Sequence, residues 1–437
     1  VFAKFKVVDA KKNLEVGSDK GTFFVIWTTT PWTLPANMAV AVNPRLTYCK
    51  VSTPAGELII NKELLANCME SFNFSESDYE IDAKTYLGSE LEGIELAHPF
   101  IDRRVPVLLG DFVTTEAGTG CVHIAPGHGH DDYILGKKHG LEVYAPVNDF
   151  GKFTKDFPEC EGQFVFKANS SIIELLRERD SLLGESDLTH SYPHCWRCKR
   201  PVIFRATAQW FISMEVGHLR KKALEVIDNV NWIPDWGKGR ITSMVSGRPD
   251  WCLSRQRAWG VPIPALKCTP CEESFLDESL IAHLVKRFKE DGADIWFTEE
   301  LSELLPKGIK CPRCGKDDLT KEEDILDVWF DSGVSFAAVL EERDYLNDKA
   351  ELYLEGSDQH RGWFQSALLT SVGTRDTAPF KSVLTHGFVV DGKGRKMSKS
   401  LGNVIAPNLI IEKYGVEVLR LWVASEDYRD EMRISDE

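Results

Sequence analysis

The sequence lacks the features that mark membrane, secreted and disordered proteins. Its 437 residues contain no run of about 18 apolar residues, which excludes a membrane-spanning helix. The first residues do not follow the charged-then-apolar layout of a secretory signal. No repeat or low-complexity tract occurs, and 43% hydrophobic residues suffice to offset chain entropy. An initiator Met is also missing, so we expect an internal fragment of a longer protein.

Basic residues are in deficit as well. The chain has 52 Lys and Arg against 67 Asp and Glu, a formal net charge of −15. This balance argues against a protein that coats nucleic acid nonspecifically, but it leaves room for local basic patches. Trp and Arg crowd together in residues 189–265. Taken alone, the mixture favours an aromatic core with a solvated basic rim, and it also suits a single-stranded nucleic-acid surface.

Cysteine is present in an odd number, and its placement points to metal. Six of the 11 cysteines form three CxxC pairs, which favours metal ligation in a reducing compartment over a disulfide framework. We therefore expect a cytoplasmic protein. Two pairs are separated by 39 intervening residues, and each places two thiolates on one tight turn. Together they predict a closed, structural zinc site with tetrahedral geometry, whose ligands are Cys268, Cys271, Cys311 and Cys314.

The third pair, Cys195 and Cys198, is half of such a site. His190 and His194 are candidate ligands to complete it, and a partner knuckle before residue 1 is an equal candidate. A pair of buried thiols without metal is the remaining interpretation.

The length suggests about three domains, and the sequence changes character along the chain. Residues 1–188 are rich in strand signals, at 23–27, 105–109 and 122–125, with a short helical pattern at 171–177. We expect a β-rich, barrel-like domain there. The expected parts that follow are a Trp/Arg-rich segment (189–265), a cysteine-flanked insertion (266–325), a parallel α/β segment (326–405) and the start of a helical connection (406–437). In the connection we expect a helix over 407–424 that is broken at Gly415. The apolar face of that last helix is expected to pack on the preceding domain.

A glycine-bounded basic loop stands near the end of the α/β segment. Residues 391–400 read DGKGRKMSKS and carry four cations within seven residues. Mobile ammonium groups suit a transition state in which charge builds on phosphates. A solvated lysine loop is the plainer interpretation, but the KMSKS string is too specific for it.

These residues resemble a known family. KMSKS is similar to the second signature of the class I aminoacyl-tRNA synthetases. Segments 327–333 (DVWFDSG) and 354–364 (LEGSDQHRGWF) are similar to the bacterial-type isoleucyl-tRNA synthetases. Valyl and leucyl relatives differ in both segments and usually carry Lys where Leu401 follows the loop. The similarity extends from about residue 20 to the end.

The resemblance implies a fold and a synthetic site. It implies an α/β protein: a β-rich editing domain inserted in a Rossmann-type class I catalytic domain, present here in its second half, plus a small zinc-binding insertion. It also implies ATP with Mg²⁺ as a substrate, and Zn²⁺. By position in the motifs, the isoleucyl-adenylate site is assigned to Glu355, Gly356, Asp358, Gln359 and His386, with Trp329 and Trp363 as walls of the side-chain pocket. For Trp363 a place in the core is the alternative. In the loop, Lys396 and Lys399 would stabilise the transition state in which pyrophosphate leaves, and Met397 and Ser398 would line the bound ATP.

Two further segments resemble the family's hydrolytic editing site. They are 28–37 (TTTPWTLPAN) and 118–133 (GTGCVHIAPGHGHDDY). Asp132 would bind the α-ammonium group of a mischarged amino acid. His123 and the threonines would position water and limit the size of the pocket. The implied site residues are Thr28, Thr29, Thr30, Asn37, His123 and Asp132. Attack by a positioned water on the aminoacyl ester is the expected mechanism.

One family signature is missing, which leaves three hypotheses. No HIGH-type tetrapeptide occurs; His128-Gly129-His130 lies in the wrong context. The first hypothesis is a fragment of an isoleucine-activating ligase, with tRNA(Ile), isoleucine and ATP as partners, no membrane contact, and a monomeric full-length enzyme. The second is a freestanding deacylase of mischarged tRNA, against which the KMSKS loop argues. The third is a noncatalytic zinc-bearing tRNA-binding protein, against which the two editing segments argue.

Overall fold

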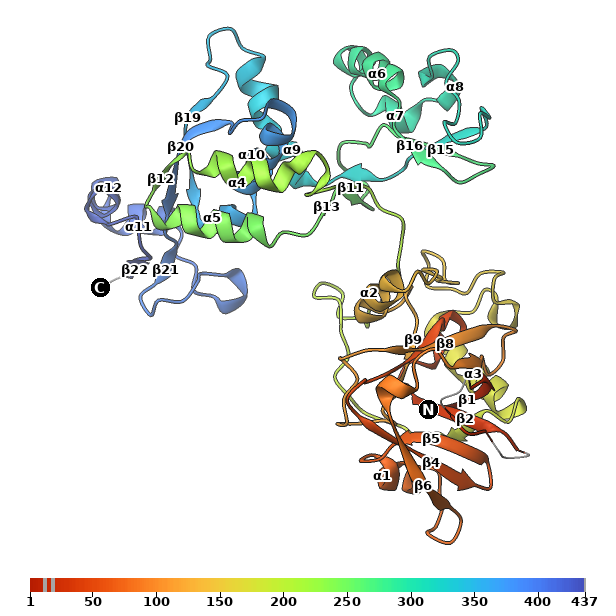
Figure 1. The fold of residues 1–437 in the computed structure, drawn as a ribbon. Helices are drawn as coiled ribbons and strands as arrows, with labels where there is room; N and C mark the ends of the chain where they lie inside the picture. The colour runs from red at the N-terminus through yellow and green to blue at the C-terminus, as the bar shows by residue number, and fades with distance from the viewer. Residues whose placement is uncertain (11–13, 17–19, 436–437) are drawn as a thin grey trace. The chain divides into compact units, whose positions relative to one another are not determined.

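The computed structural model describes residues 1–10, 14–16 and 20–435. The chain forms two compact units, Val1–Ala208 and Gln209–Glu437. Residues 189–208 lie with the first unit, where the Ala206 amide donates a hydrogen bond to the Gly127 carbonyl at 2.7 Å. Figure 1 traces both units. Of these residues, no helix has the length and apolarity that crossing a bilayer would require.

The first unit is built on one mixed sheet of ten strands. The pairing path runs β6-β4-β5-β2-β1-β7-β8-β3-β9, and β10 pairs with β1. The pairs β2/β5 and β3/β8 are parallel, while the others are antiparallel. The strands are β1 (Phe2–Asp9), β2 (Thr22–Trp27), β3 (Ala39–Val42), β4 (Thr47–Thr53), β5 (Gly56–Asn61), β6 (Glu80–Leu87), β7 (Glu95–Ala97), β8 (Arg104–Leu109), β9 (Cys121–Ile124) and β10 (Leu182–Gly184).

Three α-helices accompany this sheet: α1 (Leu65–Ser71), α2 (His130–Lys138) and α3 (Val165–Glu178). Three 3-10 helices cover Pro31–Ala36, Gly88–Glu90 and Pro158–Cys160. Helix α3 is amphipathic, since it buries Val165, Ala168, Ile172 and Leu176, which recur on one helical face. These residues join Phe5, Phe24, Leu34 and others in the main core of the unit. The predicted strands at 23–27, 105–109 and 122–125 and the predicted helix at 171–177 are confirmed.

The second unit contains a parallel sheet of three strands in the order β12-β20-β19. Its strands are β12 (Asn231–Ile233), β19 (Ala350–Gly356) and β20 (Phe380–His386). The helices α4 (Leu219–Ile227), α5 (Trp236–Ser246) and α10 (Trp363–Arg375) lie beside this sheet (Figure 1). Their apolar residues share one core with Tyr353, Phe380 and Val383. The parallel α/β arrangement predicted for this segment is confirmed.

The insertion within the second unit has a core of its own, centred on Trp296, Leu280 and Leu284. Its elements are β15 (Leu266–Cys268), β16 (Ser274–Phe275), β17 (Leu319–Lys321), α6 (Glu278–Asp291), α7 (Ile295–Thr298) and α8 (Leu301–Leu304). Asp277 caps α6 by accepting the Leu280 amide at 2.9 Å.

Short ribbons and turns connect these parts of the second unit. Three two-stranded sheets are formed by β11 (Phe211–Ile212) and β13 (Trp251–Cys252), by β14 (Ser254–Arg255) and β18 (Ile325–Leu326), and by β21 (Val389–Asp391) and β22 (Met432–Ile434). The short helices are α9 (Val328–Gly333), a π-helix at Phe336–Glu341, and 3-10 turns at Val216–His218, Ser357–Arg361 and Lys399–Leu401.

The last helical segment differs in its packing from the expectation. It is broken at Gly415 as predicted, into α11 (Pro407–Tyr414) and α12 (Val416–Ser425). Neither helix buries a residue, and Leu421 is 70% exposed. The prediction that its apolar face packs on the preceding domain is therefore wrong. The apolar spacing indicates which residues share a face of a helix, but it does not decide whether other described residues cover that face.

Candidate functional sites

The threonine-rich segment of the first unit is a turn that follows a strand. Strand β2 ends at Trp27, because Pro31 and Pro35 cannot extend a ladder and instead start and shape a 3-10 helix. The Thr28 hydroxyl accepts the Thr30 amide at 3.0 Å and lies 3.4 Å from the Thr30 hydroxyl. Thr28 and Thr30, two members of the predicted group, are thus held together by local hydrogen bonds.

His123 closes this group from the neighbouring strand. Residues 39–42 of β3 pair with β9, and that register brings His123 beside the turn. The Thr33 hydroxyl donates to the Thr30 carbonyl at 2.9 Å, so it accepts from His123 Nε2 at 3.0 Å. His123 Nδ1 then accepts from the Asn37 amide at 3.4 Å. Burial, and secondarily the charge of His128, lower the pKa of His123 to about 4, so the ring is neutral at pH 7.

Thr33 was missed by the sequence analysis. Its hydroxyl is the direct link between Thr30, 3.4 Å away, and His123. The available signal was its spacing, three residues after Thr30 in a segment that turns. A run of threonines suggests an extended strand, in which residues three apart point to opposite faces, and only the helical turn brings them together.

Asp132 stands in the first turn of α2, close to this group. Its Oδ2 accepts the Ala125 amide at 2.8 Å, and Ala125 follows β9, which carries His123. A Cβ at Gly129 would lie 2.8 Å from the Asp132 carboxyl carbon, so glycine is needed for this approach. Burial raises the pKa of Asp132 to about 6, and the Ala125 hydrogen bond partly opposes this. Among the described residues, no hydrogen bond joins Asp132 directly to the threonines or to His123.

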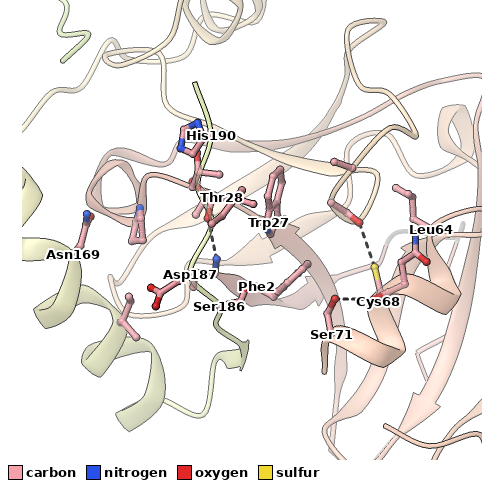
Figure 2. Close-up of a pocket in the computed structure, with 18 residues that line it drawn as sticks. Phe2, Trp27, Thr28, Leu64, Cys68, Ser71, Asn169, Ser186, Asp187 and His190 are labelled. Carbon is pink, nitrogen blue, oxygen red and sulfur yellow. Dashed lines mark hydrogen bonds between the residues drawn. The ribbon is translucent and has the colours of Figure 1, made fainter. Parts of the chain in front are cut away.

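Two cavities open beside the threonines. One of about 440 Å³ is lined by Thr28 and Thr29 together with Trp27, Asn67, Asn169 and Asp187, and Figure 2 shows its labelled walls. A second, of about 430 Å³, is lined by Thr29, Thr30 and Trp32 together with Leu188, His190 and Tyr192. The cavities share Thr29, Asn169, Leu188 and His190. Both could admit a small polar ligand.

In the second unit, the ends of two parallel strands bring predicted residues together. Gly356 at the end of β19 is in register with His386 at the end of β20. A Cβ on Gly356 would lie 2.9 Å from Asp358 Oδ1 and 3.6 Å from the His386 ring. Asp358 thus packs so closely against Gly356 that a side chain there would displace it, while the His386 ring would be in ordinary van der Waals contact. The Glu355 and Asp358 side chains are exposed at this edge.

The two predicted pocket tryptophans differ in their surroundings. The Trp363 ring stacks on Tyr353 with centroids 3.9 Å apart, and its Nε1 donates to the Ser332 carbonyl at 3.0 Å. The Trp363 amide donates to Gln359 Oε1 at 2.9 Å. Trp329 is 40% exposed, and its ring lies 2.8 Å from where a Cβ of Gly362 would stand. The Trp363 ring is thus packed against Tyr353, whereas the Trp329 ring is partly open to solvent.

The KMSKS loop is held from its base. Asp391 accepts the amides of Lys393 and Arg395 at 3.0 and 2.8 Å, and pairs with the Arg395 guanidinium. The Asn403 amide group also donates to Asp391, at 3.0 Å. This hydrogen bond is the main reason why the pKa of Asp391 lies well below its usual range. Asn403 was not singled out from the sequence.

The loop side chains themselves point outward or cap the backbone. Lys396 and Lys399 are exposed, with the Lys396 ammonium 5.7 Å from the Phe388 ring centroid. Met397 Sδ accepts the Ile405 amide at 3.5 Å, and the Ser398 hydroxyl accepts the Leu401 amide at 3.3 Å. The base is thus fixed while the two cations remain available.

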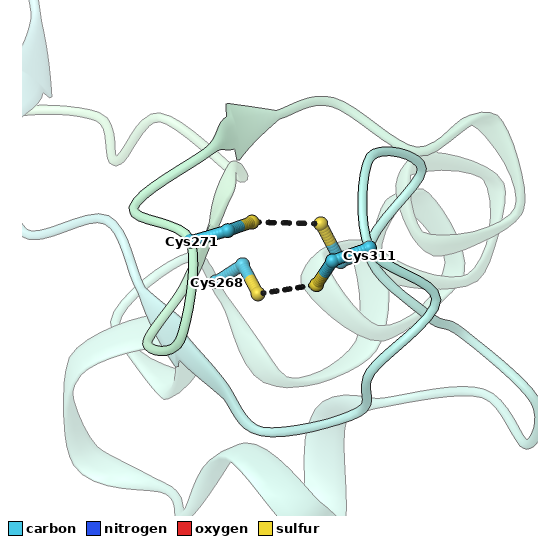
Figure 3. Close-up of side chains that lie close together, drawn as sticks. Cys268, Cys271 and Cys311 are labelled. Carbon is cyan, nitrogen blue, oxygen red and sulfur yellow. Dashed lines mark hydrogen bonds between the residues drawn. The ribbon is translucent and has the colours of Figure 1, made fainter.

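The four cysteines predicted as one metal site do converge. Their Sγ atoms all lie within 4.8 Å of one another, with Cys268–Cys314 and Cys271–Cys311 each at 3.5 Å (Figure 3). Zn–S bonds of about 2.3 Å in a tetrahedron require sulfur separations of about 3.8 Å, so the arrangement fits zinc. Four thiolates would leave no coordination position open.

The half-site of Cys195 and Cys198 gains no further ligands from the part of the chain that the structure describes. Among the described residues, the cluster in the insertion is the only group of three or more candidate ligands that meets this closeness. His190 Nδ1 and His194 Nδ1 instead lie near the carbonyls of Ser191 and Tyr192, at 2.9 and 2.7 Å. The two histidines are therefore not gathered around Cys195 and Cys198.

Comparison with known proteins agrees with these motifs. The model of the tRNA synthetases class I (I, L, M and V) matches residues 12–435. Isoleucine–tRNA ligase of Syntrophotalea carbinolica is 56% identical over 414 residues, which cover 95% of this chain and 44% of the relative. The ligase of Geobacter sulfurreducens is 55% identical, covering 96% of this chain and 45% of its own length. The ligase of Desulfovibrio desulfuricans is 53% identical, and the match covers 100% of this chain and 47% of that relative.

Two solved structures are weakly similar. A LeuRS–tRNA–LeuAMS ternary complex of Agrobacterium radiobacter K84 has a TM-score of 0.33 and 18% identity, covering 100% of this chain and 45% of that one. GlLeuRS-CP1 has a TM-score of 0.33 and 15% identity, covering 43% of this chain and 99% of that one.

The chain spans less than half the length of the ligases it matches. By the family model, which covers almost its whole length, the chain belongs to the class I tRNA synthetases of the I, L, M and V group.

Proposed function

We propose that this chain is the editing part and the second catalytic half of an isoleucine–tRNA ligase. The whole enzyme would join isoleucine to tRNA(Ile) through isoleucyl-adenylate, with ATP and Mg²⁺. The observation that carries the proposal is the identity of 53–56% to isoleucine–tRNA ligases over nearly the whole chain. The intact and anchored KMSKS loop supports a synthetase rather than a pure deacylase, which has no use for such a loop.

In the synthetic half, the ends of β19 and β20 would hold the adenylate. The register of Gly356 with His386, and the nearness of Asp358, support a site at this edge. Carboxylate and amide oxygens there suit an α-ammonium group and ribose hydroxyls, which are hydrogen-bond donors. Glu355, Gln359, Trp329 and Trp363 would complete the isoleucine side of the site, and Met397 and Ser398 would line the bound ATP. Lys396 and Lys399, exposed on a fixed base, would stabilise the leaving pyrophosphate.

In the editing part, hydrolysis would use a positioned water. A series of hydrogen-bonded side chains supports this mechanism; its members are Thr28, Thr30, Thr33, His123 and Asn37. Neutral hydroxyl groups and a neutral imidazole can orient a water molecule by hydrogen bonds without removing its proton. Thr29, which borders both cavities, would limit the size of the side chain admitted. Asp132 has a pKa of about 6, so it is mostly ionised at pH 7 and suits an α-ammonium group.

The need for two sites follows from the substrates. Isoleucine and valine differ by one methylene, worth roughly 1–3 kcal/mol in a hydrophobic pocket, a general magnitude for which this family is itself the standard illustration. A second pocket that admits valine and excludes isoleucine removes the remaining errors.

Zinc would be structural in this chain. The convergence of Cys268, Cys271, Cys311 and Cys314 on an insertion with a small separate core supports this role. Cys195 and Cys198 would bind a second metal only with ligands from outside the described residues.

The test is deacylation by the purified 437-residue chain. We expect it to hydrolyse valyl-tRNA(Ile) much faster than isoleucyl-tRNA(Ile). Asp132→Ala should abolish the hydrolysis of valyl-tRNA(Ile), because the α-ammonium group loses its partner. Asp131→Ala, an exposed neighbour in the same helical turn, is the matched control and should keep full activity. Undiminished deacylation by Asp132→Ala, with an unchanged circular dichroism spectrum, would sink the editing assignment.

A further inference from the structure

Helix α3 contributes one polar side chain to the border between the two cavities. Asn169 lies on α3, between the buried residues Ala168 and Ile172, and it lines both cavities. Figure 2 shows it at the cavity edge, on a different element from Thr28. Because α3 is fixed in the main core, this side chain has a rigid support.

One end of the Asn169 amide is already committed. Its Oδ1 accepts the Trp32 amide at 3.0 Å, across 137 residues of sequence. The reverse orientation would place the Asn169 NH₂ group against the Trp32 N–H, donor against donor, so the assignment of oxygen and nitrogen is forced. The NH₂ group is therefore the end left for the cavities. Among the described residues, no hydrogen-bond partner of Asn169 Nδ2 is found, and Nδ2 is not one of the buried unpaired atoms.

The Oδ1 end of the Asn169 amide contacts the turn that carries the proposed editing residues. Trp32 lies in the first turn of the 3-10 helix Pro31–Ala36, next to Thr33. Thr33 in turn binds His123 at 3.0 Å. Asn169 thus joins α3 to the turn that orders the hydroxyl groups, while its free donors face the space in which a substrate would lie.

We propose that Asn169 contacts the substrate of the editing reaction. Its Nδ2 donates a hydrogen bond to the carbonyl oxygen of the aminoacyl ester on the terminal ribose, and its Oδ1 fixes the threonine turn. In the reaction, the water oxygen attacks the ester carbon, the bond from that carbon to the ribose oxygen breaks, and the ribose oxygen takes a proton. Asn169 neither gains nor loses a proton, and it stabilises the negative charge that develops on the carbonyl oxygen. The inference rests on the proposed editing function.

Two substitutions separate contact from support. Asn169→Asp keeps an acceptor for the Trp32 amide but removes the donors, whereas Asn169→Ala removes both. Ser170→Ala, the exposed neighbour on α3, is the control. Each variant of the 437-residue chain is assayed for single-turnover hydrolysis of valyl-tRNA(Ile) at saturating protein, and for hydrogen exchange at the Trp32 amide. The second readout does not depend on activity.

We expect Asn169→Asp to lower the hydrolysis rate about 10- to 100-fold, the value of one hydrogen bond to a developing charge. The Trp32 amide should stay protected in this variant. Asn169→Ala should lose both rate and protection, and Ser170→Ala should match the wild type.

The proposal is overturned by full activity in Asn169→Asp, whatever the alanine variant does, because support of the turn alone would then suffice. Full activity in Asn169→Ala also overturns it. A loss of rate in Asn169→Asp would then be caused by the new carboxylate and not by the loss of the NH₂ donors. If the wild-type chain hydrolyses neither ester, the proposed function falls and this inference with it. If the wild-type chain does hydrolyse valyl-tRNA(Ile), a negative result in the variants counts against the role of Asn169 and not against the proposed function.

Discussion

The two units hold their candidate residues in opposite ways. In the first unit Asn37 and Thr33 are buried, and each is hydrogen-bonded to the buried His123. In the second unit Glu355, Asp358, Lys396 and Lys399 are exposed, and Trp329 is 40% exposed. One set is arranged before any ligand arrives, while the other presents side chains from strand ends and from an outer loop.

The difference follows from what each chemistry would require. Ester hydrolysis by water needs fixed polar groups, because a single water molecule has no other means of orientation. Capture of a nucleotide and release of pyrophosphate need cations that move with the substrate, for which an anchored loop with outward lysines is suited. Four experiments test whether the contrast is real, in order of decreasing expected effect.

The largest expected effect is on the insertion in the second unit. We expect one zinc ion per chain, and Cys311→Ser should lose the metal and unfold the insertion, because metal binding to such sites supplies about 10–16 kcal/mol of apparent folding free energy. Elemental analysis and protease protection of residues 266–325 measure this. Cys252→Ser, outside the cluster, is the control. Hydrolysis by the first unit should be unchanged, and retention of zinc by Cys311→Ser would remove the Cys₄ assignment.

The next effect compares two leucines of equal size. Leu58→Ala in β5, fully buried, should lower the free energy of unfolding of the first unit by about 2–5 kcal/mol through a cavity. Leu354→Ala in β19, 49% exposed, should cost no more than about 1 kcal/mol in the second unit. Hydrogen exchange of the amides of each sheet measures the two units separately. Equal losses would contradict the difference in burial.

The third effect is a pH dependence confined to the first unit. Burial raises the pKa of Asp132 to about 6, so its acid form persists to higher pH and the ammonium-binding form appears only above that value. The kcat/KM for valyl-tRNA(Ile), corrected for uncatalysed hydrolysis, should therefore be about tenfold lower at pH 5 than at pH 7. Asp132→Asn also lacks the charge and should lose most of the activity, and any residual hydrolysis should show no inflection near pH 6. An inflection that survives in Asp132→Asn would belong to another group.

The smallest effect concerns the base of the KMSKS loop. Asp391→Ala removes the acceptor of two loop amides, the Arg395 guanidinium and the Asn403 amide. The loop should then open more often, and trypsin should cleave after its Lys and Arg residues several-fold faster. Asp427→Ala removes only a pair with Arg429 and should leave the cleavage rate unchanged. No change in Asp391→Ala would mean that the loop is held by other contacts.

Local chemistry made much of the molecule predictable. The strand at 23–27 follows from its aromatic and β-branched residues, and the breaks at Pro31 and Gly415 follow from proline and glycine. The zinc ligands could be grouped because CxxC spacing presets two thiolates on one turn. In each of these places the signal and the structure it specifies lie within a few residues.

The rest was decided by contacts between distant segments. Thr33 became part of the site only through His123, 90 residues away, and Asn169 only through Trp32, 137 residues away. Asn403 acquired its role by reaching back to Asp391. The sequence by itself determined which hydroxyl, imidazole, carboxyl, ammonium and thiol groups are present in each motif. It also indicated roughly which of these groups belong to the same site. The tertiary structure decided their burial, their pKa values and their hydrogen-bond partners, because these depend on what the rest of the chain packs around each side chain.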